Sequence, residues 1–201
     1  MIPALTLGIE EEYLLVDPES RDLVTDPPPE FMKACKDALG ERVTPEFLRC
    51  QVEIGTPVCN NIRQARRYLV ASRRAIINNA EKCGMRVIAA STHPFAEWGR
   101  QQHSPGDRYE LLDEDMGGVI RRMLICGMHV HAGIEDPDLR IDLMNQARYF
   151  LPHLLALSTS SPFWQGHDMG MKCARLAIFD SMPRTGIPDR FDSYSEYERM
   201  I

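Results

Sequence analysis

The sequence has no apolar run long enough to cross a bilayer and no apolar leader, because Glu10 interrupts the N-terminal segment early. Its six cysteines form no CxxC pair and lie scattered in apolar segments, which is typical of free, buried thiols in a reducing compartment. Positive charge is not in excess: the net charge is −6, which argues against a nucleic-acid binder. We therefore expect a cytoplasmic protein with neither nucleic acid nor membrane as a partner.

Two common phosphate-binding loops are also missing. Neither a G-x-x-x-x-G-K-[ST] loop nor a G-x-G-x-x-G loop occurs in the 201 residues. Any nucleotide would therefore have to be held by other means than these loops. The length fits one domain, and the apolar share of 44% allows a hydrophobic core.

The segment TLGIEEEYLLVD at residues 6–17 is β-prone at both ends and carries three consecutive carboxylates. Side chains alternate between the faces of a strand, so Glu10 and Glu12 project to one side and Glu11 to the other. Two carboxylates about 7 Å apart on one face repel each other unless a cation lies near them. An edge strand with solvated charges is the alternative interpretation.

The same pattern recurs in two further segments. In residues 47–57, Glu53 shares a face with Gln51, while Cys50, Val52 and Ile54 take the other face. In residues 123–134, His129 and His131 share a face. If the three segments belong to one antiparallel sheet, one face is core and the other is lined by carboxylates and imidazoles. This predicts a metal-binding face.

Helices are predicted over residues 30–39, 62–83 and 136–157. The last has a kink or break at Pro152 and an apolar core stripe that includes Phe150, Leu154 and Leu157. The arginines of residues 62–83, Arg73 among them, are interpreted as a solvated helix face. The irregular stretch 92–108 is long enough to be functional, and we expect it to cover a substrate.

The predicted ligands are mostly oxygens. Glu10, Glu12 and Glu53 favour a hard cation, Mg²⁺ or Mn²⁺, and an imidazole is tolerated best by Mn²⁺. Three cations follow near the end of the chain: Lys172, Arg175 and Arg184. Arg184 lies in a stiff loop with two prolines, where a guanidinium is well placed to bind a carboxylate or phosphate.

Four motifs in this order resemble the type 2 glutamate–cysteine ligase family. They are GIEEEY at residues 8–13, QVEIGTP at 51–57, GMHVHAG at 127–133, and ARLAIF at 174–179 followed by PRTG at 183–186. The resemblance implies an α+β fold, a mainly antiparallel sheet with helices packed on one face, as in the glutamine-synthetase-like catalytic domain. It also implies that residues 1–201 are one catalytic domain whose C-terminal part is missing, with an acidic metal ligand and an arginine lying beyond.

The resemblance further implies an ATP-dependent carboxylate–amine ligase. Metal-bound ATP would phosphorylate the γ-carboxylate of glutamate or a similar acid, and an amine would displace the phosphate. The metal ligands would be Glu10, Glu12, Glu53 and His129, with His131 beside them. Arg175 and Lys172 would contact the phosphates, and Arg175 and Arg184 would act on the reacting groups. Small molecules are then the partners, with a homo-oligomer possible.

Two other functions remain open from the sequence. One is a non-catalytic remnant of a ligase that still binds metal or nucleotide. The other is a metal-dependent hydrolase that uses His129 and His131 with a carboxylate, like zinc sites with two histidines. The sequence does not identify the amine that is joined.

Overall fold

The computed structural model describes residues 5–201 and is built around one long strand, β1 (Thr6–Val16). β1 pairs antiparallel with β3 (Gln51–Gly55) along one edge, and with β4 (Arg86–Ile88) and β5 (Met128–Gly133) along the other. A fifth strand, β2 (Val43–Pro45), lies outside β3. The predicted α+β class with a mainly antiparallel sheet is confirmed.

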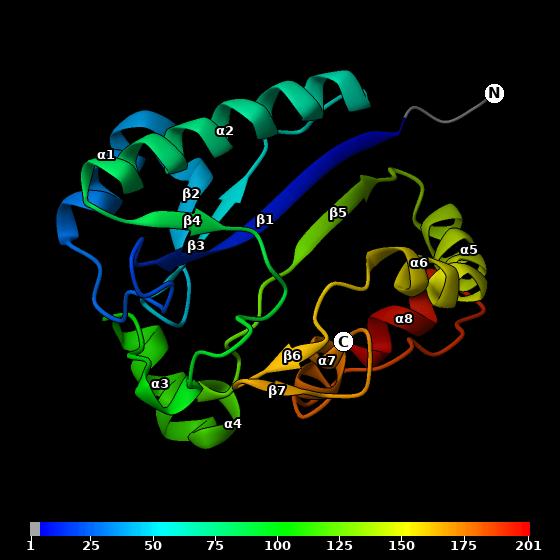
Figure 1. Cartoon of the computed structure of the whole chain (residues 1–201). Coiled ribbons are helices and arrows are strands. Elements are labelled where there is room, and N and C mark those ends of the chain that lie inside the picture. Colours follow the sequence, from blue (N-terminus) through cyan, green and yellow to red (C-terminus); the bar gives the residue numbers. More distant parts are fainter. Residues whose placement is uncertain (1–4) are drawn as a thin grey trace.

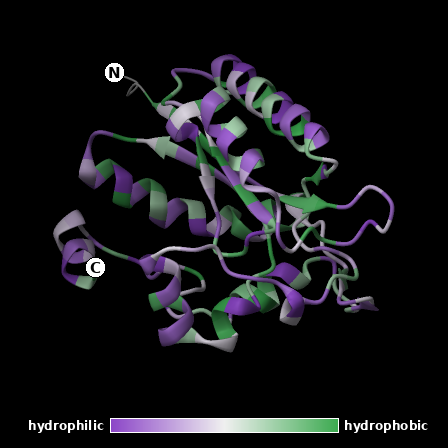
Figure 2. Ribbon diagram, turned by 90° about the vertical axis from the view of Figure 1, so that its left-hand side faces the viewer, coloured by the Kyte–Doolittle hydropathy of each residue, from purple (hydrophilic) through white to green (hydrophobic). Residues whose placement is uncertain are grey.

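The two longest N-terminal helices, α1 (Pro29–Leu39) and α2 (Ile62–Lys82), cover one face of this sheet (Figure 1). Ile9, Tyr13 and Leu15 of β1 point toward them and join the first hydrophobic core. Hydrophobic and hydrophilic residues alternate along the helices at the top of Figure 2, as expected for helices buried on one side. Helices on one face of the sheet were predicted, and these two helices confirm it.

The sequence fixes both ends of α2. The side chain of Asn61 accepts a hydrogen bond from the backbone N–H of Gln64 at 3.0 Å, which satisfies a free donor of the first turn. Gly84 follows the last turn with φ +72, a conformation that glycine adopts without steric cost.

The other face of the sheet is covered at one end by a second hydrophobic core. Leu14 and Val16 of β1 pack there with Leu124 and Ile178. The remaining elements are η1 (Gly40–Arg42), η2 (Trp98–Arg100), α3 (Asp107–Met116), α4 (Gly118–Arg121), α5 (Pro137–Ala147), η3 (Arg148–Phe150), α6 (Leu151–Ser158), β6 (Phe163–Trp164), β7 (His167–Asp168), α7 (Ala174–Phe179) and α8 (Tyr194–Met200). In the described part of the chain, no helix has the length and apolarity needed to cross a membrane.

The predicted apolar stripe of residues 136–157 is wrong as a core stripe. The chain breaks before Pro152 through the 3-10 turn η3, whose tighter winding shifts the phase of the pattern. Phe150, Leu154 and Leu157 are 54%, 56% and 87% exposed, and α6 has no buried residue on any face.

Two smaller expectations also fail. Cys50 joins the second core and not the helix-covered face, because β3 begins only at Gln51 and strand alternation does not extend to Cys50. Arg73 is not simply solvated: its Nε donates to Glu11 at 2.7 Å, and a second guanidinium nitrogen pairs with the same carboxylate. The six thiols are free, as predicted.

Candidate metal and phosphate site

The pairing of the strands brings the predicted metal ligands together. Glu12 lies opposite Glu53 across the β1–β3 ladder, and Glu10 lies opposite His129 across the β1–β5 ladder. His131 is two residues farther along β5, on the same face. All five predicted ligands therefore lie on the face that α1 and α2 leave open, where strand alternation placed them.

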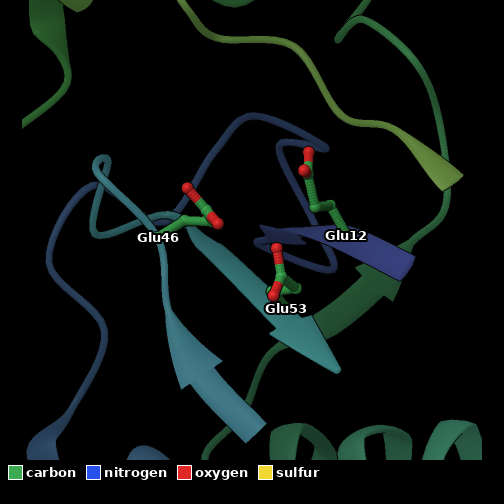
Figure 3. A group of neighbouring side chains, drawn as sticks. All are labelled: Glu12, Glu46 and Glu53. Atoms are coloured by element: carbon green, nitrogen blue, oxygen red, sulfur yellow. The ribbon is translucent and has the colours of Figure 1, made fainter. Parts of the chain in front are cut away.

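Within this face, the carboxylates of Glu12 and Glu53 gather with a third one, Glu46. One oxygen from each of the three lies within 4.8 Å of the other two, which defines the acidic cluster shown in Figure 3. Three hard oxygen donors at this spacing fit a Mg²⁺ or Mn²⁺ ion. The cluster therefore offers the carboxylate oxygens that the sequence predicts from Glu12 and Glu53, and Glu46 adds a ligand that was not predicted.

Glu46 escaped the sequence argument because it is not on a strand. It follows β2 directly, in the connection to β3, so the alternation that selects the other ligands does not apply to it. Only the pairing of β2 with β3, in which Thr44 lies opposite Glu53, brings this connection to the site. No strand was predicted at residues 43–45, so no local pattern singled out this carboxylate.

The remaining predicted ligands form a separate group. The Nδ1 atom of His129 lies 3.2 Å from Oε2 of Glu10, and the Nε2 atom of His131 lies 3.1 Å from the same oxygen. Burial alone would raise the pKa of Glu10, but hydrogen bonds from His131 and His129 outweigh it and lower that pKa. The structure thus divides the five predicted ligands between an acidic cluster and an imidazole–carboxylate group.

The acidic cluster carries unfavourable negative charge. Burial, followed by the neighbouring Glu46, raises the pKa of Glu53 to about 7. Burial also raises the pKa of Glu12. The backbone N–H of Gly127, which donates to Oε2 of Glu12 at 2.9 Å, lowers this pKa but does not offset the effect of burial. Bringing a cation to these carboxylates would relieve both effects.

Arg175, at the start of α7, lies beside the acidic cluster. Glu12, Gly127 and Arg175 all line one cavity of about 950 Å³, whose other walls include leucines of α6 and Phe179. The guanidinium lies 6.0 Å from the Phe179 ring, and its buried Nε has no hydrogen-bond partner within residues 5–201. A buried donor without a partner in such a cavity can bind an oxyanion.

The approach of Arg175 to the strand depends on Gly127. A Cβ atom at that position would lie 2.7 Å from Nη2 of Arg175 and 2.9 Å from Nε2 of His129, both shorter than real contacts. Only glycine leaves room for both side chains. Gly127 is thus a site residue that the sequence argument quoted in a motif without giving it a role.

Two predicted cations do not line this cavity, although the residues that follow them in the chain do. Lys172 and Arg184 are exposed, and neither lines the cavity. Arg184 has φ +58 in the loop after α7. Lys172 was predicted to contact the phosphates and Arg184 to act on the reacting groups. This arrangement does not support either role, and both stay predictions.

A family model described as glutamate-cysteine ligase family 2 matches residues 6–201. The chain belongs to this family. A relative from Rhodospirillum rubrum is 57% identical over 99% of this chain and 52% of its own length, and one from Jannaschia is 53% identical over 98% and 52%. Both carry glutamate–cysteine ligase 2 as a provisional name. The chain therefore spans about half the length of the curated relatives it matches.

Solved structures share the fold at low identity. A bifunctional glutathione synthetase from Pasteurella multocida superposes with a TM-score of 0.69 at 14% identity, over 96% of this chain and 29% of that one. A glutamate–cysteine ligase from Francisella tularensis, in complex with AMP, gives 0.65 at 20% identity, over 80% and 36%. These structures confirm the fold.

Proposed function

We propose that this chain provides the metal-binding face of an ATP-dependent carboxylate–amine ligase. The observation that carries the proposal is the acidic cluster, whose member Glu12 lines the same cavity as Arg175. Membership of a glutamate–cysteine ligase family and a fold neighbour crystallised with AMP support a ligase that uses a nucleotide. Mg²⁺ or Mn²⁺ is the cation we assign to Glu12, Glu46 and Glu53, with Glu10, His129 and His131 as a second, adjoining group.

In the proposed reaction, a carboxylate of glutamate or a similar acid attacks the γ-phosphorus of ATP. This gives an acyl phosphate and ADP, and an amine such as that of cysteine then attacks the carbonyl carbon and releases phosphate. When bound, the divalent cation neutralises phosphate oxygens and aligns the transfer. Arg175 contributes a forked donor to a phosphate or substrate carboxylate, and the backbone N–H of Gly127 orients Glu12.

The test is ADP release by this chain with Mn²⁺ or Mg²⁺, ATP and glutamate, with cysteine and a panel of other amines. Mass spectrometry identifies the amide. Glu53→Ala and Arg175→Ala should abolish turnover, while Glu41→Ala, which removes an exposed carboxylate from η1, should leave it unchanged. Amine-dependent ADP and a γ-glutamyl product establish the ligase and name the acceptor.

A second function, a metal- and nucleotide-binding remnant, follows if Mn²⁺ and ATP bind without turnover. Zinc in the purified protein, with hydrolysis that needs no ATP, would instead favour the hydrolase that uses His129 and His131 with Glu10.

A further inference from the structure

The segment predicted to cover a substrate lies against the backbone that carries Glu46. Oγ of Ser104 donates to the main-chain carbonyl of Glu46 at 2.5 Å, and the N–H of Ser104 donates to the carbonyl of Phe47 at 2.7 Å. The hydroxyl of Tyr109 donates to the carbonyl of Pro45 at 2.8 Å. Three hydrogen bonds from residues 104–109 thus reach three consecutive carbonyls, with Glu46 in the middle.

The contact continues past Phe47. The N–H of Arg49 donates to the carbonyl of Gln102 at 2.9 Å, and Leu48 and His103 form an isolated antiparallel bridge. Residues 102–104 therefore follow residues 46–49 almost as a strand would. Ser104 is buried, so its bonds to this backbone are shielded from water.

Glu46 needs this support more than the other two ligands of the acidic cluster. Glu12 and Glu53 are held by the ladder between β1 and β3, whereas Glu46 lies between the end of β2 at Pro45 and the start of β3. Without a cation, its carboxylate is repelled by the other two. A connection without ladder bonds would move to relieve that repulsion unless its backbone were fixed from outside.

We propose that Ser104 and Tyr109 are positioning residues that hold Glu46 where it completes the acidic cluster. This inference rests on the proposed function, because it requires that the cluster binds a divalent cation. Both side chains act on main-chain carbonyls, so neither touches the cation nor the substrate. Their role is to keep the third ligand at its distance from Glu12 and Glu53 before the cation arrives.

The experiment measures Mn²⁺ affinity by electron paramagnetic resonance of free Mn²⁺. Ser104→Ala and Tyr109→Phe each remove one donor and little volume, and each should weaken Mn²⁺ binding about 10-fold, as the loss of a group that orients a ligand typically does. The matched controls are Ser72→Ala and Tyr68→Phe on α2, which lie in the helix layer on the opposite side of the sheet. Both controls should bind Mn²⁺ as the wild type does.

A general loss of stability could also weaken binding, so both substitutions are repeated in a Glu46→Gln background. A positioning role through Glu46 predicts that Ser104→Ala and Tyr109→Phe then change the affinity less than about 2-fold, because the ligand that they hold is already gone. A purely structural role predicts the same 10-fold loss in both backgrounds and would overturn the proposal.

The outcomes also separate this proposal from the proposed function. If the wild type binds Mn²⁺ and both single variants bind it equally well, the positioning role is refuted while the metal site stands. If the wild type binds no Mn²⁺, the metal site itself is refuted and the positioning role falls with it. Weaker binding that depends on Glu46 supports both.

Discussion

The pKa of Glu53 makes the metal-free protein sensitive to pH. Folding raises this pKa from 4.5 to about 7, so the folded state favours the protonated carboxyl. The contribution of Glu53 to stability is then most favourable below pH 4.5, declines as the pH rises from 4.5 through 7, and stays low above that range. At about 1.4 kcal/mol for each pKa unit, the loss is at most about 3.5 kcal/mol, and solvent screening reduces it to about 1–3 kcal/mol.

Glu53→Gln tests this reasoning, because an uncharged amide resembles the protonated carboxyl. In EDTA, urea unfolding at pH 8 should show the variant to be about 1–3 kcal/mol more stable than the wild type, and at pH 4.5 the two should be nearly equal. Glu41→Gln is a control that neutralises an exposed carboxylate of η1, outside the acidic cluster.

Adding Mg²⁺ or Mn²⁺ should reverse the order at pH 8. A cation that binds only the folded protein stabilises it by mass action, and the variant lacks one of its ligands. If Glu53→Gln is no more stable than the wild type at pH 8 in EDTA, the carboxylates do not repel one another as the structure implies, and the argument for a preformed cation site fails with them.

Three other perturbations test separate parts of the structure. Arg73→Ala leaves the carboxylate of Glu11 buried and should lower the free energy of unfolding by about 2 kcal/mol in urea, against almost no change for the exposed Arg74→Ala. Gly127→Ala should weaken nucleotide binding about 10-fold in calorimetry by displacing Arg175, and unchanged binding would contradict the short contacts. Ellman's reagent should label two of the six thiols much faster than the other four, which are buried. The fast pair is Cys83 and Cys173.

Strand alternation explains what could be predicted of the site from sequence. The period of two assigns Glu10 and Glu12 to one face, and the same rule places Glu53, His129 and His131 on that face once the strands pair. Within one strand the rule needs no knowledge of the neighbouring strands, whereas the face that the three strands share depends on how they pair. It gave the correct face for every predicted metal ligand.

What could not be predicted depends on contacts between distant segments. Glu46 becomes a ligand only when β2 pairs with β3, and Ser104 supports it only because residues 102–104 fold back onto residues 46–49. Arg73 pairs with Glu11, which lies 62 residues away in the sequence. Glu11 faces α2, whereas Glu10 and Glu12 on the same strand face the site. No local periodicity encodes such pairings, so the arginine was indistinguishable from its solvated neighbours on α2.

The three consecutive glutamates of β1 show how the fold separates structural charge from charge that needs a ligand. Glu11 faces α2 and is neutralised inside the protein by Arg73, with the Tyr13 hydroxyl as a further donor. Glu12 faces the other way, and across residues 5–201 neither it nor its partners in the acidic cluster forms a salt bridge with a lysine or arginine. A shift of β1 by one residue would exchange these environments. Glu11 would then turn away from Arg73 to the open face, and a neighbouring glutamate would be placed on the face covered by α2. The pairing of Glu11 with Arg73 therefore favours the same register of β1 as its apolar residues do, and this register leaves Glu10 and Glu12 on the face that can bind a divalent cation.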